Sequence, residues 1–152
     1  MSEIFANLPY ELKLYIFTYS RKPQSRRLLR DIENFSYTWP VLKAAYYQIW
    51  IDEWEETEED AHGWIQNDIM RYVNEEQPTQ IIYTSNFFDY WKRLYSINSY
   101  NEALKFNKRL FDVSRRTQNG NDSTLERISR NMWALLLPHE RCSFLAMFLG
   151  ST

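Results

Sequence analysis

Apolar residues recur at three- and four-residue intervals along most of the chain. Near the N-terminus, Leu12, Tyr15, Ile16 and Tyr19 occupy the i, i+3, i+4 and i+7 positions after Pro9. This spacing puts apolar side chains on one face of an α-helix, whereas a half-buried strand alternates at every second residue. The same spacing predicts helices over residues 9–19, 28–39, 40–54, 65–73, 86–95, 99–116, 123–137 and 138–149.

Prolines and capping residues set the expected helix ends. Pro40 should begin a new helix, because a residue before proline is pushed out of the helical region, so the helix lined by Leu28, Leu29 and Ile32 should end before it. Pro138 should likewise close one helix and start the last. Three further pairs have the spacing of N-terminal caps, namely Asn86 with Asp89, Ser99 with Glu102, and Ser123 with Glu126.

β-Structure has little support in the sequence. Residues 81–83 (Ile-Ile-Tyr) favour a strand by propensity, but no partner segment is available, so we expect an extended linker. The pattern therefore predicts a compact all-α bundle of seven to eight short helices in a single domain, residues 1–152. A polar stretch at 75–85 would divide it into helical sub-units 1–75 and 86–152.

Composition supports a folded chain in a reducing compartment. Hydrophobic residues make up 44% of the 152 residues and aromatic residues 17%, which is far more than a disordered chain carries. Cys142 is the single cysteine, so no intrachain disulfide can form, and secretion is not expected. The N-terminus lacks the pattern of a signal peptide, and no apolar run is long enough to predict a membrane span.

The net charge of −2 conceals three blocks of opposite sign. Residues 1–30 carry six Lys/Arg and two Asp/Glu, residues 31–90 carry two and thirteen, and residues 91–152 carry ten and five. Such asymmetry favours contacts with oppositely charged surfaces, either on another copy of the chain or on a neighbouring protein.

Few residues qualify for catalysis or for binding a metal. His62, His139 and Cys142 are the candidates of the common nucleophile and base types, and their spacing matches no metal motif. His139 and Cys142 could form an imidazole–thiol pair, but Cys142 falls on a core-facing stripe and His139 on an exposed first turn. With three glycines there is no phosphate-binding loop. We therefore expect no enzyme activity, catalytic residues, metal or cofactor.

The strongest surface feature is an acidic tract flanked by tryptophans. It lacks the residue order of a calcium loop. Trp50, Trp54 and Trp64 flank the tract, and aromatic anchors beside charge are typical of protein interfaces. We expect this region to dock on a basic surface; the alternative is a solvated helix end. The tract consists of Asp52, Glu53, Glu55, Glu56, Glu58, Glu59 and Asp60.

Two basic stretches raise the question of nucleic-acid binding. They span residues 21–30 and 105–116, and Lys92 and Arg93 stand near Trp91. The pI of about 5.7 and the core-facing spacing of Trp91 argue against this function. A protein partner is therefore preferred over nucleic acid.

The N-terminal segment Leu8-Pro9-Tyr10-Glu11-Leu12, followed by Ile16-Phe17, resembles the first half of an F-box. The resemblance covers about residues 7–45. In that family, these helices dock on the small adaptor subunit of cullin ubiquitin ligases. The resemblance therefore implies partner contacts at Leu8, Pro9, Leu12, Ile16 and Phe17.

Together with this start, residues 29–35 and 64–69 are similar to segments of small proteins from large double-stranded DNA viruses. Those proteins include F-box-like host modulators and small capsid components. We therefore expect a non-enzymatic interaction protein, a minor capsid-associated component that binds capsid or virion proteins, in the virion or the host cytoplasm. The alternative is an F-box-like adaptor that recruits targets to a cullin ubiquitin ligase.

Overall fold

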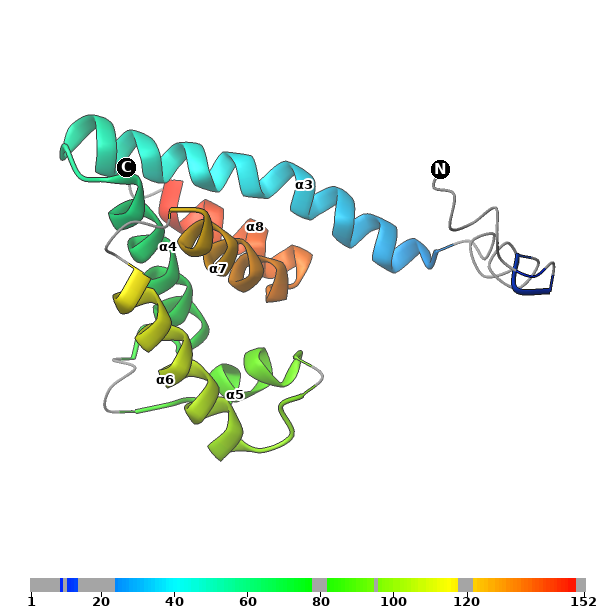
Figure 1. Ribbon diagram of the computed structural model, residues 1–152. Helices are drawn as coiled ribbons and strands as arrows, with labels where there is room; N and C mark the ends of the chain where they lie inside the picture. Colours follow the sequence, from blue (N-terminus) through cyan, green and yellow to red (C-terminus); the bar gives the residue numbers. More distant parts are fainter. Residues whose placement is uncertain are drawn as a thin grey trace. The chain divides into compact units, whose positions relative to one another are not determined.

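A computed structural model describes residues 9, 11–13, 24–77, 82–94, 96–117 and 122–149 (Figure 1). The chain divides into two compact units, Met1–Ile32 and Glu33–Thr152. Of the helix expected over residues 9–19, the structure describes Pro9 and a helical turn at 11–13, in which the Lys13 amide donates to the Pro9 carbonyl at 3.0 Å. The remainder of that helix lies outside the described residues.

Helices account for all the regular structure in the described ranges, which confirms the all-α prediction. Residues 82–84 form no strand, as expected of a linker. The elements are α3 (Arg26–Tyr47), the π-helical turn η1 (Gln48–Glu53), α4 (Glu58–Val73), α5 (Ser85–Lys92), α6 (Tyr100–Thr117), α7 (Asp122–Leu135) and α8 (Pro138–Leu149).

The predicted helix boundary at Pro40 is wrong, because α3 runs through it. Proline removes the bond to the carbonyl four residues earlier, that of Ser36, and Ser36 and Pro40 both lie on the exposed side of the helix, where water can solvate that carbonyl. The Thr38 hydroxyl also donates to the Asn34 carbonyl at 2.8 Å. Burial of Leu42 and Tyr46 on the opposite face then favours one continuous helix.

Local capping explains the other differences in helix ends. Thr57 forms a capping box with Asp60, so α4 starts at Glu58, seven residues before the predicted start, and contains Gly63. The N-cap of α5 is Thr84 and not Asn86, and this helix ends at Lys92 instead of reaching residue 95.

Of the three remaining predicted helix starts, those at Ser99 and Pro138 are confirmed and the one at Ser123 is wrong. Ser99 and Glu102 exchange the expected capping bonds at the start of α6, at 3.0 and 3.3 Å. α7 already begins at Asp122, so Ser123 lies inside the helix and is not its cap. The start of α8 at Pro138 is confirmed.

The core of the second unit is built where α4 packs along α7; α6 also packs on α7, and α5 contacts both α4 and α6 (Figure 1). Trp133 of α7 is fully buried, and its indole N–H donates to the Thr38 hydroxyl at 3.1 Å. A buried polar cluster links α4, α6 and α7: the Gln66 amide donates to Ser129 at 3.1 Å and accepts from Ser114 at 2.7 Å. These bonds satisfy polar groups that would otherwise be costly to bury.

Two predictions of core-facing positions are wrong. Leu28, Leu29 and Ile32, expected to line a buried face, are 42%, 50% and 54% exposed. Cys142, expected on a core stripe, is exposed. In α8 the core is filled by Phe144 and by the stem of the buried Arg141, which leaves Cys142 on the outer side.

Candidate functional site

Three tryptophans meet where α3 passes into α4. Trp50 lies on η1, Trp54 follows it, and Trp64 lies in the second turn of α4. The Trp50 and Trp64 rings stack with centroids 4.3 Å apart and 5° between their planes, and Trp54 is 5.9 Å from Trp50. Trp54 is 65% and Trp64 40% exposed. The structure thus brings together the aromatic residues that flank the acidic tract in sequence.

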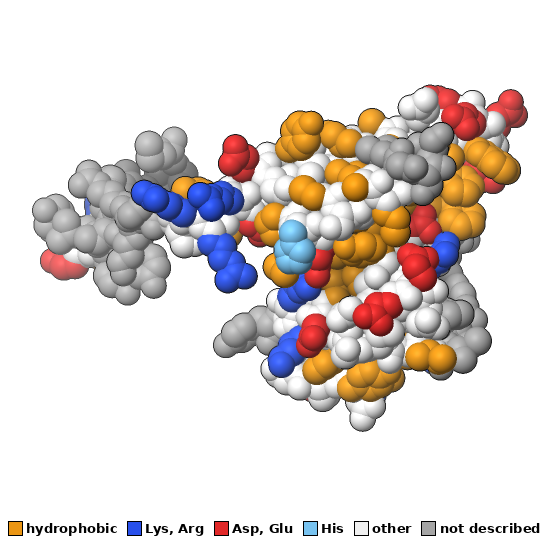
Figure 2. Space-filling view, turned by 180° about the vertical axis from the view of Figure 1, so that it is seen from behind, with side chains coloured by type: hydrophobic (Ala, Val, Ile, Leu, Met, Phe, Trp, Pro, Cys, Tyr) orange, Lys and Arg blue, Asp and Glu red, His pale blue; other side chains and the backbone are white. Residues whose placement is uncertain are grey.

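Exposed carboxylates surround this aromatic stack. Figure 2 shows acidic side chains beside apolar ones around the end of α3. In the part of the chain that the structure describes, none of these carboxylates forms a salt bridge. We call this region the tryptophan–acid surface; it comprises Trp50, Trp54, Trp64, Asp52, Glu53, Glu55 and Glu56.

A tight turn carries the carboxylates. Glu55 has a φ of 58°, in the left-handed region, which costs a non-glycine residue about 1 kcal/mol. The Glu55 amide bonds the Ile51 carbonyl at 3.1 Å and the Glu56 amide bonds the Trp50 carbonyl at 2.9 Å. These two bonds fix the reversal that returns the chain from Trp50 to α4, and so to Trp64.

Tyr47 and His62 form a second set of contacts beside the tryptophan–acid surface. The Tyr47 hydroxyl donates to the Glu58 carboxylate at 2.9 Å and lies 3.3 Å from Nε2 of His62, which is fully buried. His62 also lies parallel to the Trp39 ring, at 6.4 Å and 10°. These contacts join the end of α3 to the start of α4.

The remaining acidic candidates have local roles or lie outside the description. Glu58 is exposed and accepts the Tyr47 bond, so it acts as a support for the turn. The side chain of Glu59 lies outside the described part of the chain. Asp60 accepts from the Thr57 hydroxyl at 2.7 Å and caps α4. The Thr57-x-x-Asp60 spacing was the sequence signal for this cap, whereas nothing in the sequence points to Tyr47 and His62 as neighbours.

The F-box-like candidates are described only in part. Pro9 and Leu12 are exposed, Leu12 to 49%. Leu8, Ile16 and Phe17 lie outside the described residues, so the structure does not place these three candidates.

Of the three candidates for catalysis, His62 is buried beside Tyr47, and the other two lie on α8. His139 and Cys142 are both exposed on α8, and the Cys142 sulfur accepts a hydrogen bond from the Asn34 amide at 3.5 Å. Among the described residues, no three His, Cys, Asp or Glu side chains are grouped to hold a metal ion. Trp91 is buried, as its spacing predicts.

A hollow of about 330 Å³ adjoins the tryptophan–acid surface. It lies between α4 and α6 and shares Trp64 with that surface. Gly63 opens onto it, and a Cβ atom added there would meet no atom within 4 Å. The lining residues are Asp60, Gly63, Trp64, Gln66, Asn67, Phe111 and Ser114.

Gly63→Ala is therefore expected to stabilise the protein. Glycine inside a helix costs about 0.5–1 kcal/mol relative to alanine, and the open space at this position adds no clash. Urea denaturation followed by circular dichroism should show a free energy of unfolding higher by that amount. A loss of stability would mean that the space next to Gly63 is needed for packing.

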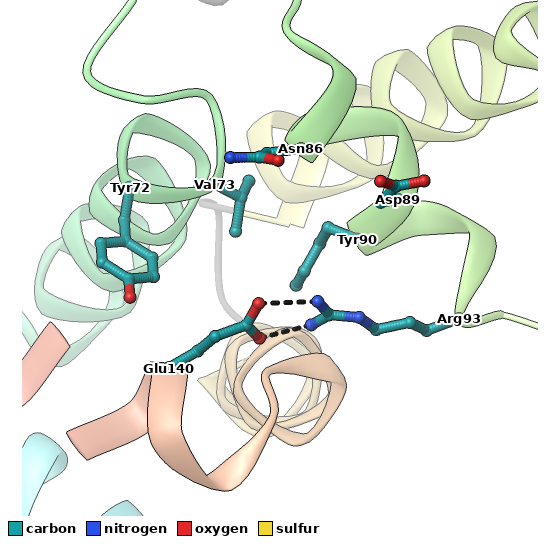
Figure 3. Close-up of a pocket in the computed structure, with 7 residues that line it drawn as sticks. All are labelled: Tyr72, Val73, Asn86, Asp89, Tyr90, Arg93 and Glu140. Atoms are coloured by element: carbon teal, nitrogen blue, oxygen red, sulfur yellow. Dashed lines mark hydrogen bonds and ion pairs between the residues drawn. The ribbon is translucent and has the colours of Figure 1, made fainter. Parts of the chain in front are cut away.

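A second hollow, about 370 Å³ in volume, contains a charge pair (Figure 3). The Arg93 guanidinium binds both carboxylate oxygens of Glu140, at 2.5 and 2.7 Å, and donates to the Leu135 carbonyl at 2.8 Å. Glu140 also accepts the Leu137 amide at 2.7 Å. Both charged groups of the pair therefore have hydrogen-bond partners. The pair is a structural link that joins α5 to the α7–α8 corner.

This pair should make stability depend on pH. Burial by itself raises the pKa of Glu140, but hydrogen bonds from Arg93 and the Leu137 amide, with the Arg93 charge, outweigh burial and lower the pKa. A lowered folded-state pKa adds stability above the ordinary glutamate pKa, and this stability is lost as pH falls through the lowered value. Glu140→Gln should cost about 1–3 kcal/mol at pH 7 and flatten the acid side of the stability profile.

Glu126→Gln is the matched control for this measurement. Glu126 binds Lys43 through one contact at 3.0 Å and is more exposed than Glu140. Its loss should cost less than about 1 kcal/mol. Equal costs for the two variants, measured by urea denaturation, would contradict the structural role given to the Arg93 pair.

Comparison with known proteins finds no matching family model, no matching curated protein and no matching solved structure. Within the described ranges, no helix combines the length and the apolar character needed to cross a bilayer.

Proposed function

We propose that this protein is a non-enzymatic interaction protein that docks a basic protein surface on its tryptophan–acid surface. The observation that carries the proposal is the Trp50–Trp64 stack, with Trp54 at its edge, exposed among carboxylates that have no cation partner among the described residues. Tryptophan is the residue most enriched at interface hot spots, and its ring face attracts guanidinium and ammonium groups. Carboxylates around the rings would steer such a partner into place.

We further propose a structural role for this contact, as a minor capsid-associated component of a large DNA virus particle. The particle setting rests on the sequence resemblance of residues 29–35 and 64–69 to small proteins of such viruses. Docking by rigid aromatic anchors and fixed charge suits a protein that holds neighbours at a constant ratio.

The test is mild cross-linking of the native material, followed by mass spectrometry of partners present at a fixed ratio. Capsid or virion proteins should be linked near the tryptophan–acid surface. Neutralising its acids (Glu53→Gln, Glu55→Gln, Glu56→Gln) should remove those links. A matched control (Glu33→Gln, Asp89→Asn, Asp112→Asn) changes the charge equally at exposed positions elsewhere and should keep them. A neutralised variant that retained every partner would refute the proposal.

The adaptor alternative has one observation in its favour: Leu12, a contact residue of the F-box pattern, is 49% exposed. Under that alternative, the small adaptor subunit of a cullin ligase should bind the chain, and Leu12→Asp should abolish the binding. The same substitution should leave partners of the tryptophan–acid surface unaffected. Co-purification of the two recombinant proteins would decide between the alternatives.

A further inference from the structure

The first two turns of α3 present a basic and aliphatic surface, in contrast to the acidic and aromatic tryptophan–acid surface. Arg26, Arg27 and Arg30 are exposed there, and Figure 2 shows basic side chains gathered at the start of this helix. None of the three forms an ion pair among the described residues. Leu28, Leu29 and Ile32 share a separate face of the same two turns and are 42–54% exposed. We call residues 26–32 the basic–aliphatic segment; its single acid is Asp31.

Exposed leucine and isoleucine side chains at helical spacing are typical of a surface that is covered in an assembly. The arginines beside these side chains limit which kind of partner surface could cover them. The partner surface should offer apolar groups to the aliphatic face and negative charge to the arginines on the other face, and planar rings suit both the aliphatic chains and the guanidinium groups. The tryptophan–acid surface of the same chain has this composition.

We infer that the basic–aliphatic segment of one copy docks on the tryptophan–acid surface of a second copy. This inference rests on the proposed function and gives the basic partner an identity, namely the chain itself. The contact joins two different surfaces, so after pairing one copy keeps its tryptophan–acid surface free and the other keeps its basic–aliphatic segment free. Such head-to-tail contacts repeat into rings or open chains, which suits a component that links positions in a particle.

Charge exchange between the two surfaces tests the inference. One variant reverses the segment (Arg26→Glu, Arg27→Glu, Arg30→Glu), and the other reverses the surface (Glu53→Lys, Glu55→Lys, Glu56→Lys). In sedimentation velocity the wild type should self-associate with rising concentration, and added salt should weaken the association. Each variant alone should remain monomeric, because its two surfaces then carry like charge.

An equimolar mixture of the two variants should associate again, because each surface then meets its opposite on the other variant. A general folding defect could not give this recovery. Circular dichroism of each variant checks that the helices are intact. Monomeric behaviour of the wild type at every concentration, or of the mixture when both variants are folded, would overturn the inference.

A peptide experiment separates this failure from failure of the proposed function. A peptide of residues 24–33, which contains three arginines, and a poly-arginine peptide of three residues are titrated separately into the full chain while tryptophan fluorescence is followed. Preferential binding of the chain's own peptide, lost in Trp54→Ala, supports self-docking. Binding of poly-arginine alone overturns self-docking but supports a basic partner of another kind. Absence of binding by both peptides, together with unchanged cross-linked partners in the neutralised variant, would refute both proposals.

Discussion

Replacing Arg141 with methionine should lower the free energy of unfolding by about 3–5 kcal/mol, because three acceptors lose their donor at about 1–3 kcal/mol each. Arg141 is 1% exposed, yet its guanidinium is well matched: Nε donates to the Trp133 carbonyl at 3.1 Å, and the two terminal nitrogens donate to Asn34 and to the Ala134 carbonyl at 3.0 and 3.1 Å. The carbonyls belong to the last turn of α7, where the helix dipole favours a cation. Methionine fills the volume but leaves these acceptors buried without donors.

Arg130→Met is the control for the Arg141 substitution. Arg130 lies on α7 and its guanidinium is 5.7 Å from the centre of the Phe35 ring, the ring that Arg141 approaches at 5.5 Å. Arg130 is exposed, however, so we expect a change within about 0.5 kcal/mol. Urea denaturation of both variants makes the comparison. Similar losses would mean that the shared ring contact, and not the capping of α7, accounts for the role of Arg141.

Arg141 also illustrates what hydrophobic periodicity cannot predict. A pattern of apolar positions identifies the faces that are buried, and it predicted the burial of Trp91 correctly. It assigns an arginine to the surface by default, because a charge is costly to bury without partners. Here the partners come from a helix end and from Asn34, more than a hundred residues away in sequence, and these neighbours exist only after folding.

The same limit applies at Pro40 and at the exposed start of α3. The rule that helices end before proline describes a local steric bias at the preceding residue, here Trp39, and burial of Trp39, Leu42 and Tyr46 along α3 outweighs it. Leu28, Leu29 and Ile32 have perfect helical spacing but are exposed. Spacing predicts that residues share a face and says nothing about whether the same chain covers it. An apolar helix face that its own chain leaves exposed is a candidate for contact with another chain, as we propose for the basic–aliphatic segment.

The candidate site was predictable in composition and not in geometry. The sequence places Trp50, Trp54 and Trp64 around seven acids, and that composition predicts an interface. The parallel stacking of Trp50 on Trp64 depends on the π-helical turn and on the left-handed backbone at Glu55, which change the direction of the chain. Neither feature has a reliable signal in residue type.

The α4–α5 connection contains a second buried polar residue, Asn74, whose replacement should have an effect of similar size. Its side chain is fully buried at the C-terminal end of α4. The amide nitrogen donates to the carbonyls of Gln77 and Ile82 at 2.9 and 2.8 Å, and the amide oxygen accepts from the Thr84 amide at 2.9 Å. Thr84 is in turn the N-cap of α5, so one side chain fixes the end of one helix and the start of the next.

Asn74→Asp changes no volume but places a carboxylate oxygen against two carbonyl oxygens. We expect a loss of about 3–5 kcal/mol at pH 7, measured by urea denaturation, against less than about 0.5 kcal/mol for Asn131→Asp on the exposed side of α7. The carbonyls should raise the pKa of the new carboxyl in the folded state. The deficit relative to wild type should therefore be smallest below the ordinary aspartate pKa, where the protonated acid donates one bond, and should grow as pH rises through the raised value. A deficit independent of pH would show that the two carbonyls do not face the side chain, and that Asn74 does not join α4 to α5 through them.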